Sequence, residues 1–324
     1  MSDNVYETLY NRILDISACI HIPLKSFAMY VVIWYTPPQL RHYSYFILNA
    51  MFWNFLCNFV FAFMHLYPLF PAICFRVDGI SSHFIDNEVF GQSMFILMFF
   101  FISECAFALL FAFPHRYIVF AHPKLAARIK PAWVFAFCIA IHFLFALIYF
   151  PIVIGWTVSY DDYPNKAELP EFVFCFYPNG IRKIATILAY FLAITIGSLL
   201  LFSSSFLFLR SLKRLKIGII HKETLALQKK VFASLRMLTA IALFFAGIPI
   251  FTCIVVEIFP YTLYSREAGL VSVVVLANYG SISAVAYLVF FKAYRDAVKR
   301  IFSNLFRIFT GRNTKVRSIG LIVF

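Results

Sequence analysis

The chain has 324 residues, of which 62% are hydrophobic and 13% charged, and its formal net charge is +13. Soluble domains carry about 25% charged residues, so this composition excludes an ordinary soluble enzyme and predicts an integral membrane protein. The basic residues border apolar stretches, where they set topology and attract anionic lipid. We therefore expect the lipid bilayer, and no nucleic acid, as the partner of this positive charge.

Seven apolar stretches follow one another along the chain, each long enough to cross a membrane as a helix. A hydrocarbon core about 30 Å thick requires about 20 apolar residues per helix. The stretches lack the period of two that is typical of strands, and helices satisfy their own backbone groups in lipid. We predict an all-α membrane protein, a seven-transmembrane helix bundle. Its spans are expected at residues 9–35, 44–70, 89–114, 132–156, 180–209, 234–259 and 268–291.

Lysine and arginine gather on one side of this predicted bundle. Arg41 and the segments 116–130, 210–236 and 292–317 together carry 21 of the 28 lysines and arginines. Positive loops stay in the cytoplasm. An odd number of spans then places the N-terminus outside and the basic C-terminal segment inside.

Two spans contain residues that disturb a regular apolar helix. Lys25 lies in the first span, where it can snorkel to the interface or line a pocket, and the sequence leaves both open. Pro249 follows Gly247 in the sixth span. A proline inside a helix removes a backbone hydrogen bond, so we predict a kink there.

A short amphipathic helix is predicted after the seventh span. Apolar residues recur there at helical spacing up to Phe309, with Arg295, Lys299 and Arg307 between them. Such a pattern is typical of a helix lying on the inner leaflet, and a disordered basic tail is the alternative. We expect one seven-span domain over residues 1–309, including this helix, and a basic cytoplasmic tail over 310–324.

Glu104 and Glu257 lie within the third and sixth predicted spans, where burial of a charge is costly and usually functional. Glu104, in the middle of span three, is either a ligand, ion or switch carboxylate or a structural glutamate bonded to Asn54 or Asn58. Glu257, near the outer end of span six, is either a ligand contact or a wetted interface residue. His142 in span four is interpreted as a packed helix residue.

Motifs of soluble enzymes are missing from the sequence. It contains no phosphate-binding loop, no GxSxG and no His/Cys cluster with zinc spacing. We therefore predict no catalytic residue, no metal site, no cofactor and no enzyme. The scarcity of intramembrane charges also opposes an ion-coupled transporter. Retinal is not expected either, because Lys292, the only lysine near span seven, lies at its cytoplasmic end.

The inner end of span three contains Arg116-Tyr117. By position alone, this arginine is either a positive-inside anchor or a fork of donors for the backbone of an inserted partner helix. The pair resembles the Asp/Glu-Arg-Tyr motif of G-protein-coupled receptors, with His115 in place of the acid.

The end of span seven carries a second resemblance to these receptors. Tyr287 precedes Tyr294-Arg295 by the spacing between the tyrosine of their Asn-Pro-x-x-Tyr motif and the helix that follows. Ser283 and Ala284 stand where that motif has Asn-Pro. Both resemblances lie at the depth in the membrane that the receptor architecture requires.

The chain is similar to nematode serpentine chemoreceptors of the class H, I, D and Str-type superfamily, most clearly toward its N-terminal end. The segments that carry this resemblance are Tyr35-Thr36-Pro37, Leu40-Arg41-His42-Tyr43-Ser44-Tyr45, Leu48-Asn49, Phe52-Trp53-Asn54, Tyr67-Pro68-Leu69-Phe70-Pro71 and, near the C-terminus, Phe291-Lys292-Ala293-Tyr294-Arg295. The resemblance covers essentially the whole chain.

This resemblance implies a receptor that binds an odorant-like small molecule in an outward-facing helical pocket and activates a heterotrimeric G protein. It also implies a multi-pass protein of the plasma membrane, in a sensory-neuron cilium. The alternative is a ligand-gated channel or carrier of the inverted seven-helix odorant-receptor type. Such proteins have an internal N-terminus, which the lysine and arginine distribution opposes.

The candidate site residues fall into four groups. Glu104 and Glu257 are candidate ligand contacts, and Pro249 and Tyr287 are candidate kink and switch positions. The loop charges and the Arg-Tyr motif predict a G-protein contact surface at Arg116, Tyr117, Lys124, Arg128, Lys213, Arg214, Lys229 and Lys230.

Cysteines form the fourth group. Cys74 and Cys175 are the two that lie outside the spans, both on the outer side, where an oxidising compartment allows them to pair. The resemblance implies a bridge between them, and two unpaired cysteines are the alternative.

Overall fold

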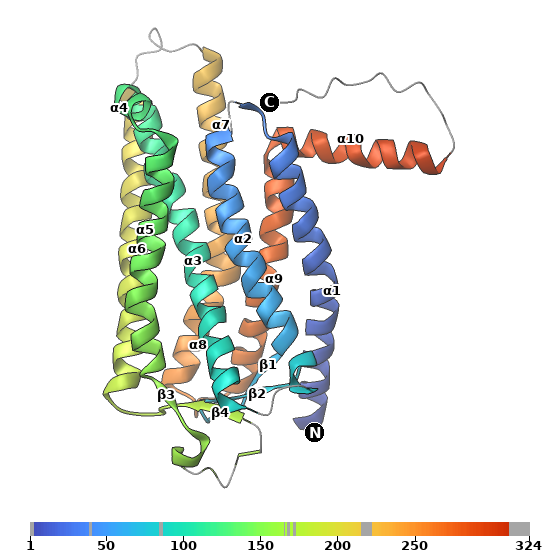
Figure 1. Ribbon diagram of the computed structural model, residues 1–324, viewed down its shortest axis with the longest axis vertical. Helices are drawn as coiled ribbons and strands as arrows, with labels where there is room; N and C mark the ends of the chain where they lie inside the picture. Colours follow the sequence, from blue (N-terminus) through green and yellow to red (C-terminus); the bar gives the residue numbers. More distant parts are fainter. Residues whose placement is uncertain are drawn as a thin grey trace.

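Seven long helices form the body of the computed structural model, which describes residues 3–38, 41–83, 87–164, 166, 169–170, 173–214 and 222–310. Figure 1 shows them side by side, with the N-terminus and a small sheet at one end, here called the sheet end, and α10 at the other, called the α10 end. Seven spans are long and apolar enough to cross a membrane. Six of them are single elements: α1 Asp3–Tyr35, α2 Arg41–Met64, α3 Glu88–Ala121, α5 Pro131–Ile154, α6 Ile181–Arg214 and α9 Ser265–Phe290.

The sixth span is built from three consecutive segments. These are α7 Lys222–Ala242, the π-helical segment η5 Leu243–Gly247 and α8 Ile248–Ile258. Two shorter helices, α4 Pro123–Arg128 and α10 Lys292–Phe309, follow the third and the seventh spans. Single 3-10 turns, η2 Ile80–His83 and η3 Tyr160–Asp162, lie at the sheet end. The predicted seven-helix bundle is confirmed. The tail from residue 311 onward lies outside the described residues.

The surface of the bundle is apolar where a membrane would surround it. Phe143 of α5 and Leu192 and Phe202 of α6 are between 61% and 69% exposed. Helices that are hydrophobic on all sides are typical of membrane spans. Inside the bundle, α3 packs against α2, α5 and α6, while α9 packs against α1, α2, α7 and α8.

Among the predicted helix boundaries, the ends of the second and third spans differ from the structure by six and seven residues. The second span was expected to reach residue 70, but α2 ends at Met64, because His65 adopts a positive φ of 42° that terminates a helix. The third span was expected to end at 114, but α3 continues through Pro114 to Ala121. A helix of 34 residues is about 51 Å long, more than the hydrocarbon thickness, so its last turns extend beyond the hydrocarbon.

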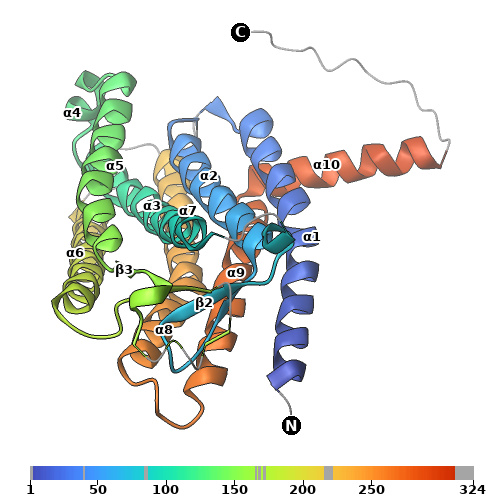
Figure 2. The same ribbon diagram turned by 60° about the horizontal axis from the view of Figure 1, so that its bottom comes forward.

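An antiparallel sheet of four strands, which the sequence did not predict, covers the sheet end. Its order is β1-β2-β4-β3, and its strands are β1 Leu66–Pro68, β2 Cys74–Val77, β3 Thr157–Val158 and β4 Val173–Phe176. Cys74 lies opposite Cys175 in the register of β2 and β4, and a disulfide joins the two. Figure 2, in which this end is turned forward, shows β2 lying across the bundle.

Aromatic side chains attach the sheet to the helices. Phe174 and Phe176 of β4 are almost completely buried, and both rings lie within 6 Å of the Phe95 ring of α3. A side chain at Gly91 would overlap the Phe174 ring, so α3 needs a glycine at this position. The sheet thus fills space at the end of the bundle where an outward-facing pocket was expected.

A polar cluster ties α1 to the same sheet. Tyr10 donates a hydrogen bond of 2.6 Å to the carbonyl oxygen of Leu66. Arg76 of β2 forms ion pairs with Glu7 of α1 and with Asp78. The hydrogen bond with Asp78 is the largest influence on Arg76, and it raises the pKa of the guanidinium above its ordinary value. A disulfide therefore holds the sheet together, and apolar, ionic and hydrogen-bonding contacts hold it to the bundle.

Replacement of Cys74 tests how much the sheet depends on its bridge. Cys74→Ser is expected to lower the free energy of unfolding by about 2–4 kcal/mol, because the disulfide joins residues 101 positions apart. Thermal unfolding of the purified protein in detergent measures this. The control is Cys19→Ser, which removes an exposed free thiol from α1. Equal midpoints for the two variants would contradict the prediction.

Candidate functional site

A lysine ammonium lies inside the bundle where α1, α2, α3 and α9 meet. The Lys25 side chain is 2% exposed, and its Nζ donates to Asn54 twice, at 2.5 Å to Oδ1 and at 3.2 Å to the backbone oxygen. The described residues form no ion pair with it. Of the two possibilities that the sequence left open, the structure therefore has the pocket and not the snorkelling lysine.

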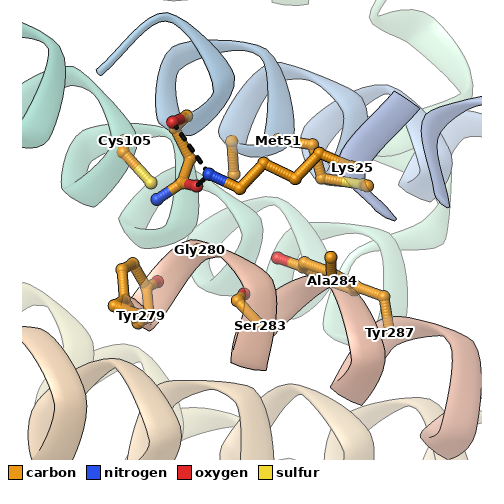
Figure 3. Close-up of a pocket in the computed structure, with 10 residues that line it drawn as sticks. Lys25, Met51, Cys105, Tyr279, Gly280, Ser283, Ala284 and Tyr287 are labelled. Carbon is orange, nitrogen blue, oxygen red and sulfur yellow. Dashed lines mark hydrogen bonds between the residues drawn. The ribbon is translucent and has the colours of Figure 1, made fainter. Parts of the chain in front are cut away.

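Small and polar residues of α9 make room for this ammonium. Figure 3 shows Lys25 extended over α9, with Tyr279, Ser283 and Tyr287 on the turns that face it. A side chain at Gly280 would collide with both Asn54 Oδ1 and Lys25. The remaining cavity is about 10 Å³, room for about one water molecule. In this conformation the site is a polar junction between helices and does not hold an organic ligand.

Further hydrogen bonds connect α9 to α1 and α2 beside this junction. His21 of α1 is bonded to Ser281, and Asn58 of α2 donates to the backbone oxygen of Ala277 at 2.6 Å. Polar groups in a bundle surrounded by lipid need partners, because hydrocarbon offers none. These bonds therefore fix α1, α2 and α9 relative to one another.

Glu104 lies elsewhere, between α3 and α5. Its side chain is completely buried, and Oε2 is bonded to Nδ1 of His142. Nε2 of His142 lies 3.3 Å from Nδ2 of Asn49 on α2. The expected partners were wrong, since Asn54 binds Lys25 and Asn58 binds α9. His142 was interpreted as a packed residue and is the actual partner; no spacing within one span could have shown this pairing.

Glu257 belongs to a separate contact between α6 and α8. Lys183 Nζ lies 3.2 Å from Glu257 Oε1 and donates to the Glu257 backbone oxygen at 3.1 Å. Both side chains are mostly buried. The structure does not bring Glu257 and Glu104 together. Glu257 contacts Lys183 of α6, whereas Glu104 contacts His142 of α5. A role in ligand binding stays a prediction for each.

At the α10 end, the arginine of the Arg-Tyr motif is not free to meet a partner. Arg116 is 7% exposed, and its guanidinium lies 4.4 Å from the centre of the Tyr43 ring on α2. Tyr117 stacks edge-on against His122 at 5.7 Å. Tyr287 is buried in the core.

Four buried rings close the α10 ends of α3, α6 and α7. We call Phe113 and Phe120 of α3, Phe208 of α6 and Phe232 of α7 the phenylalanine cluster. Phe208 and Phe232 stack with centroids 4.1 Å apart, Phe120 lies 5.0 Å from Phe208, and Phe113 meets Phe232 edge-on at 6.2 Å. The sequence reasoning missed this cluster, because forty-two phenylalanines give no signal that distinguishes these four.

The remaining predicted contact residues surround this closed end. Lys124 and Arg128 are exposed on α4, and Lys229 and Lys230 are exposed on α7. Lys213 and Arg214 lie at the end of α6. Pro249 is buried two residues after the π-helical segment η5. The bases thus lie on α4, α6 and α7 toward the α10 end, whereas the predicted kink lies further along the sixth span.

Sequence comparison agrees with this geometry. The family model described as "Serpentine type 7TM GPCR chemoreceptor Srh" matches residues 6–304. The chain belongs to this family of serpentine chemoreceptors. No curated protein sequence matches the chain. Among solved structures, squid rhodopsin is similar at 16% identity with a TM-score of 0.67, over 98% of this chain and 90% of that chain.

These findings establish the class of the protein. It is a seven-span membrane receptor with the fold of G-protein-coupled receptors, and its family is one of chemoreceptors and not of enzymes. The likeness to squid rhodopsin is a likeness of fold alone. Predictions about a nematode-type serpentine chemoreceptor and about the bundle are confirmed, while the roles of individual site residues stay predictions.

Substitution of Gly280 tests the polar junction of the receptor. Gly280→Ala is expected to lower the free energy of unfolding by about 1–3 kcal/mol, as overpacking does in other cores, because the new methyl group displaces Lys25 from Asn54. Thermal unfolding in detergent is the measurement. The control is Gly197→Ala on α6, where only the end of the Leu110 side chain is close. If Gly280→Ala unfolded at the same temperature as the unmodified receptor, or at a higher one, this result would contradict the packing described here.

Proposed function

We propose that this receptor detects an odorant-like small molecule and activates a heterotrimeric G protein at its α10 end. We also propose that it resides in the plasma membrane of a sensory-neuron cilium with the N-terminus outside. Its family supports the chemosensory role, and the lysine and arginine distribution supports the orientation. The observation on which the proposal depends is the phenylalanine cluster, which closes the α10 end of the bundle. In the sixth span, the cluster lies nearer to that end than the π-helical segment η5 does.

We interpret this arrangement as the resting state of the receptor. Arg116 is buried on Tyr43, and the phenylalanine cluster fills the space between α3, α6 and α7. A partner helix gains access to Arg116 only after the α10 end of α7 separates from α3. Stacked rings contribute about 0.5–1.5 kcal/mol beyond their area burial. The cluster is thus strong enough to favour the closed state and weak enough for a ligand to overcome.

The sixth span contains the hinge that such a separation requires. In η5 the helix changes to π-type bonding over Leu243–Gly247, and Pro249 lacks the N–H that would continue the regular pattern. Sharp bends in helices occur at prolines and at π-bulges. We propose that α7 swings about this hinge. A ligand drives the movement only to the extent that it binds the open state more tightly than the closed one.

Removal of the Phe232 ring tests this resting state. Phe232→Ala is expected to raise ligand-free signalling about tenfold, because it deletes the ring that joins α7 to both α3 and α6. The measurement is G-protein activation in transfected cells at matched surface expression. Phe206→Ala removes an exposed ring of α6 and is the control, with no expected change. Unchanged basal signalling in Phe232→Ala would show that the cluster does not hold the receptor closed.

Charge reversal tests the proposed contact surface. Lys229→Glu with Lys230→Glu is expected to reduce receptor-driven G-protein activation about tenfold. The new carboxylates would repel the acidic partner surface that these lysines are proposed to meet. Both lysines are exposed on α7, so folding and surface expression should persist. Lys166→Glu, at the sheet end, is the control. Full signalling by the doubly reversed receptor at normal surface expression would exclude this surface as the contact.

A further inference from the structure

A groove opens on the side of the bundle between α2 and α5. Its volume is about 360 Å³, and its lining includes Phe46, Asn49 and Phe52 of α2 together with Phe135, Ile139 and His142 of α5. Both helices pack against α3, which contributes His115 to the lining. The volume falls in the range of about 300–1,000 Å³ that is typical of small-molecule sites.

The groove faces the membrane and not the solvent at either end. Phe52 is 50% exposed, Phe135 45% and Ile139 65%, all on the outer surface of the spans. At the α10 end, Tyr45 and Phe135 close the groove with their rings 5.2 Å apart. At the other end, the Trp53 ring lies 5.6 Å from the His142 ring. A molecule that enters this groove therefore arrives sideways from the bilayer.

Polar side chains line part of this groove, although the surrounding hydrocarbon offers no hydrogen-bond partner. Asn49 and His142 both line it, and they are hydrogen-bonded to each other at 3.3 Å through Nδ2 and Nε2, which leaves Oδ1 of Asn49 as the acceptor that faces the groove. Glu104 lies behind His142, completely buried, and among the described residues its Oε1 accepts no hydrogen bond. Lipid-facing polar groups are costly when nothing satisfies them. A ligand with a hydrogen-bonding group would remove part of that cost.

The depth of these polar atoms selects the kind of ligand. His142 lies eleven residues beyond Pro131, the first residue of α5, which corresponds to about 16 Å along the helix. That is about half of the hydrocarbon thickness of about 30 Å. Membrane sterols and phospholipids hold their polar groups at the interface and so leave this depth unmatched. A smaller amphiphile, free to move into the core, can place a polar group there.

The charge of the site and the length of the groove restrict the class of ligand further. Glu104 and His142 already form a pair, so an ionised ligand would add an uncompensated charge near the bilayer centre, which is costly. From Tyr45 to Phe52 the α2 helix rises about 10 Å, the reach of a medium-length aliphatic chain. The site therefore suits a neutral molecule that is mostly hydrocarbon.

We propose that this groove binds an uncharged aliphatic molecule with a single hydroxyl group, which enters from the bilayer and donates a hydrogen bond to Oδ1 of Asn49. This inference deepens the proposed chemosensory function, because it names the class of ligand and the place of binding. It rests on that proposal only for its biological meaning, since binding itself requires no G protein.

Photolabelling of the full-length receptor in phosphatidylcholine nanodiscs tests the inference. The probe is an eight-carbon primary alcohol with a diazirine on its chain, and excess 1-octanol is the competitor. Label is expected on residues 45–52 and 134–142, found by mass spectrometry of peptides. Asn49→Leu should reduce this labelling about tenfold, the effect of a lost hydrogen bond. Ile139→Trp should block the groove from its exposed rim, and Leu192→Trp on α6 is the matched control with no expected effect.

Several outcomes would overturn the inference. Equal labelling by a diazirine alkane without the hydroxyl would exclude a hydrogen bond from the ligand to Asn49. Competition by cholesterol and not by octanol would assign the groove to a membrane sterol, and crosslinks between two receptors through residues 134–142 would assign it to a second copy. Labelled but non-signalling receptors would support this site while contradicting the proposed coupling, so the two failures are distinguishable.

Discussion

The receptor is organised around a cation that cannot leave the bundle. Lys25 is buried in the polar junction, where its ammonium donates to Asn54, and Gly280 gives it the space to lie against α9. Together with the bonds from His21 and Asn58, this contact makes α1, α2 and α9 a frame whose separation would expose polar atoms to lipid. On the opposite side, α7 meets α3 through rings. The proposed movement of α7 away from α3 breaks ring contacts and leaves these polar bonds in place.

The sequence predicted those parts of the architecture that depend on properties summed over a single span or loop. Hydropathy and the positions of lysine and arginine add up over a span or a loop, so the seven helices followed without knowledge of neighbours. Cys74 and Cys175 could be selected because they are the only cysteines outside the spans. The π-helical segment could not be found in this way, although Pro249 indicated that the helix is irregular there.

The remainder depends on how helices are rotated about their axes, which composition does not determine. Glu104 and His142 meet across 38 positions of sequence, and nothing on span three indicated which face of span four it would meet. The sheet was missed for a different reason. Its strands have two to four residues, too few for a periodic pattern, and Leu66–Pro68 continued the apolar run of the second span. Short strands of this kind form because the disulfide and buried aromatic rings hold them in place.

Helix geometry connects the groove to the phenylalanine cluster. Glu104 and Phe113 lie on the same helix, nine residues apart, and about 100° of rotation per residue puts them on opposite faces of α3. One face meets His142 of α5, and the other meets Phe232 of α7. A helix responds to force as a rigid element, provided that it has two packed positions to move between. Under the proposed function, a ligand that drew α3 toward α5 at His142 would draw Phe113 away from Phe232 and so weaken the contact that keeps the α10 end closed.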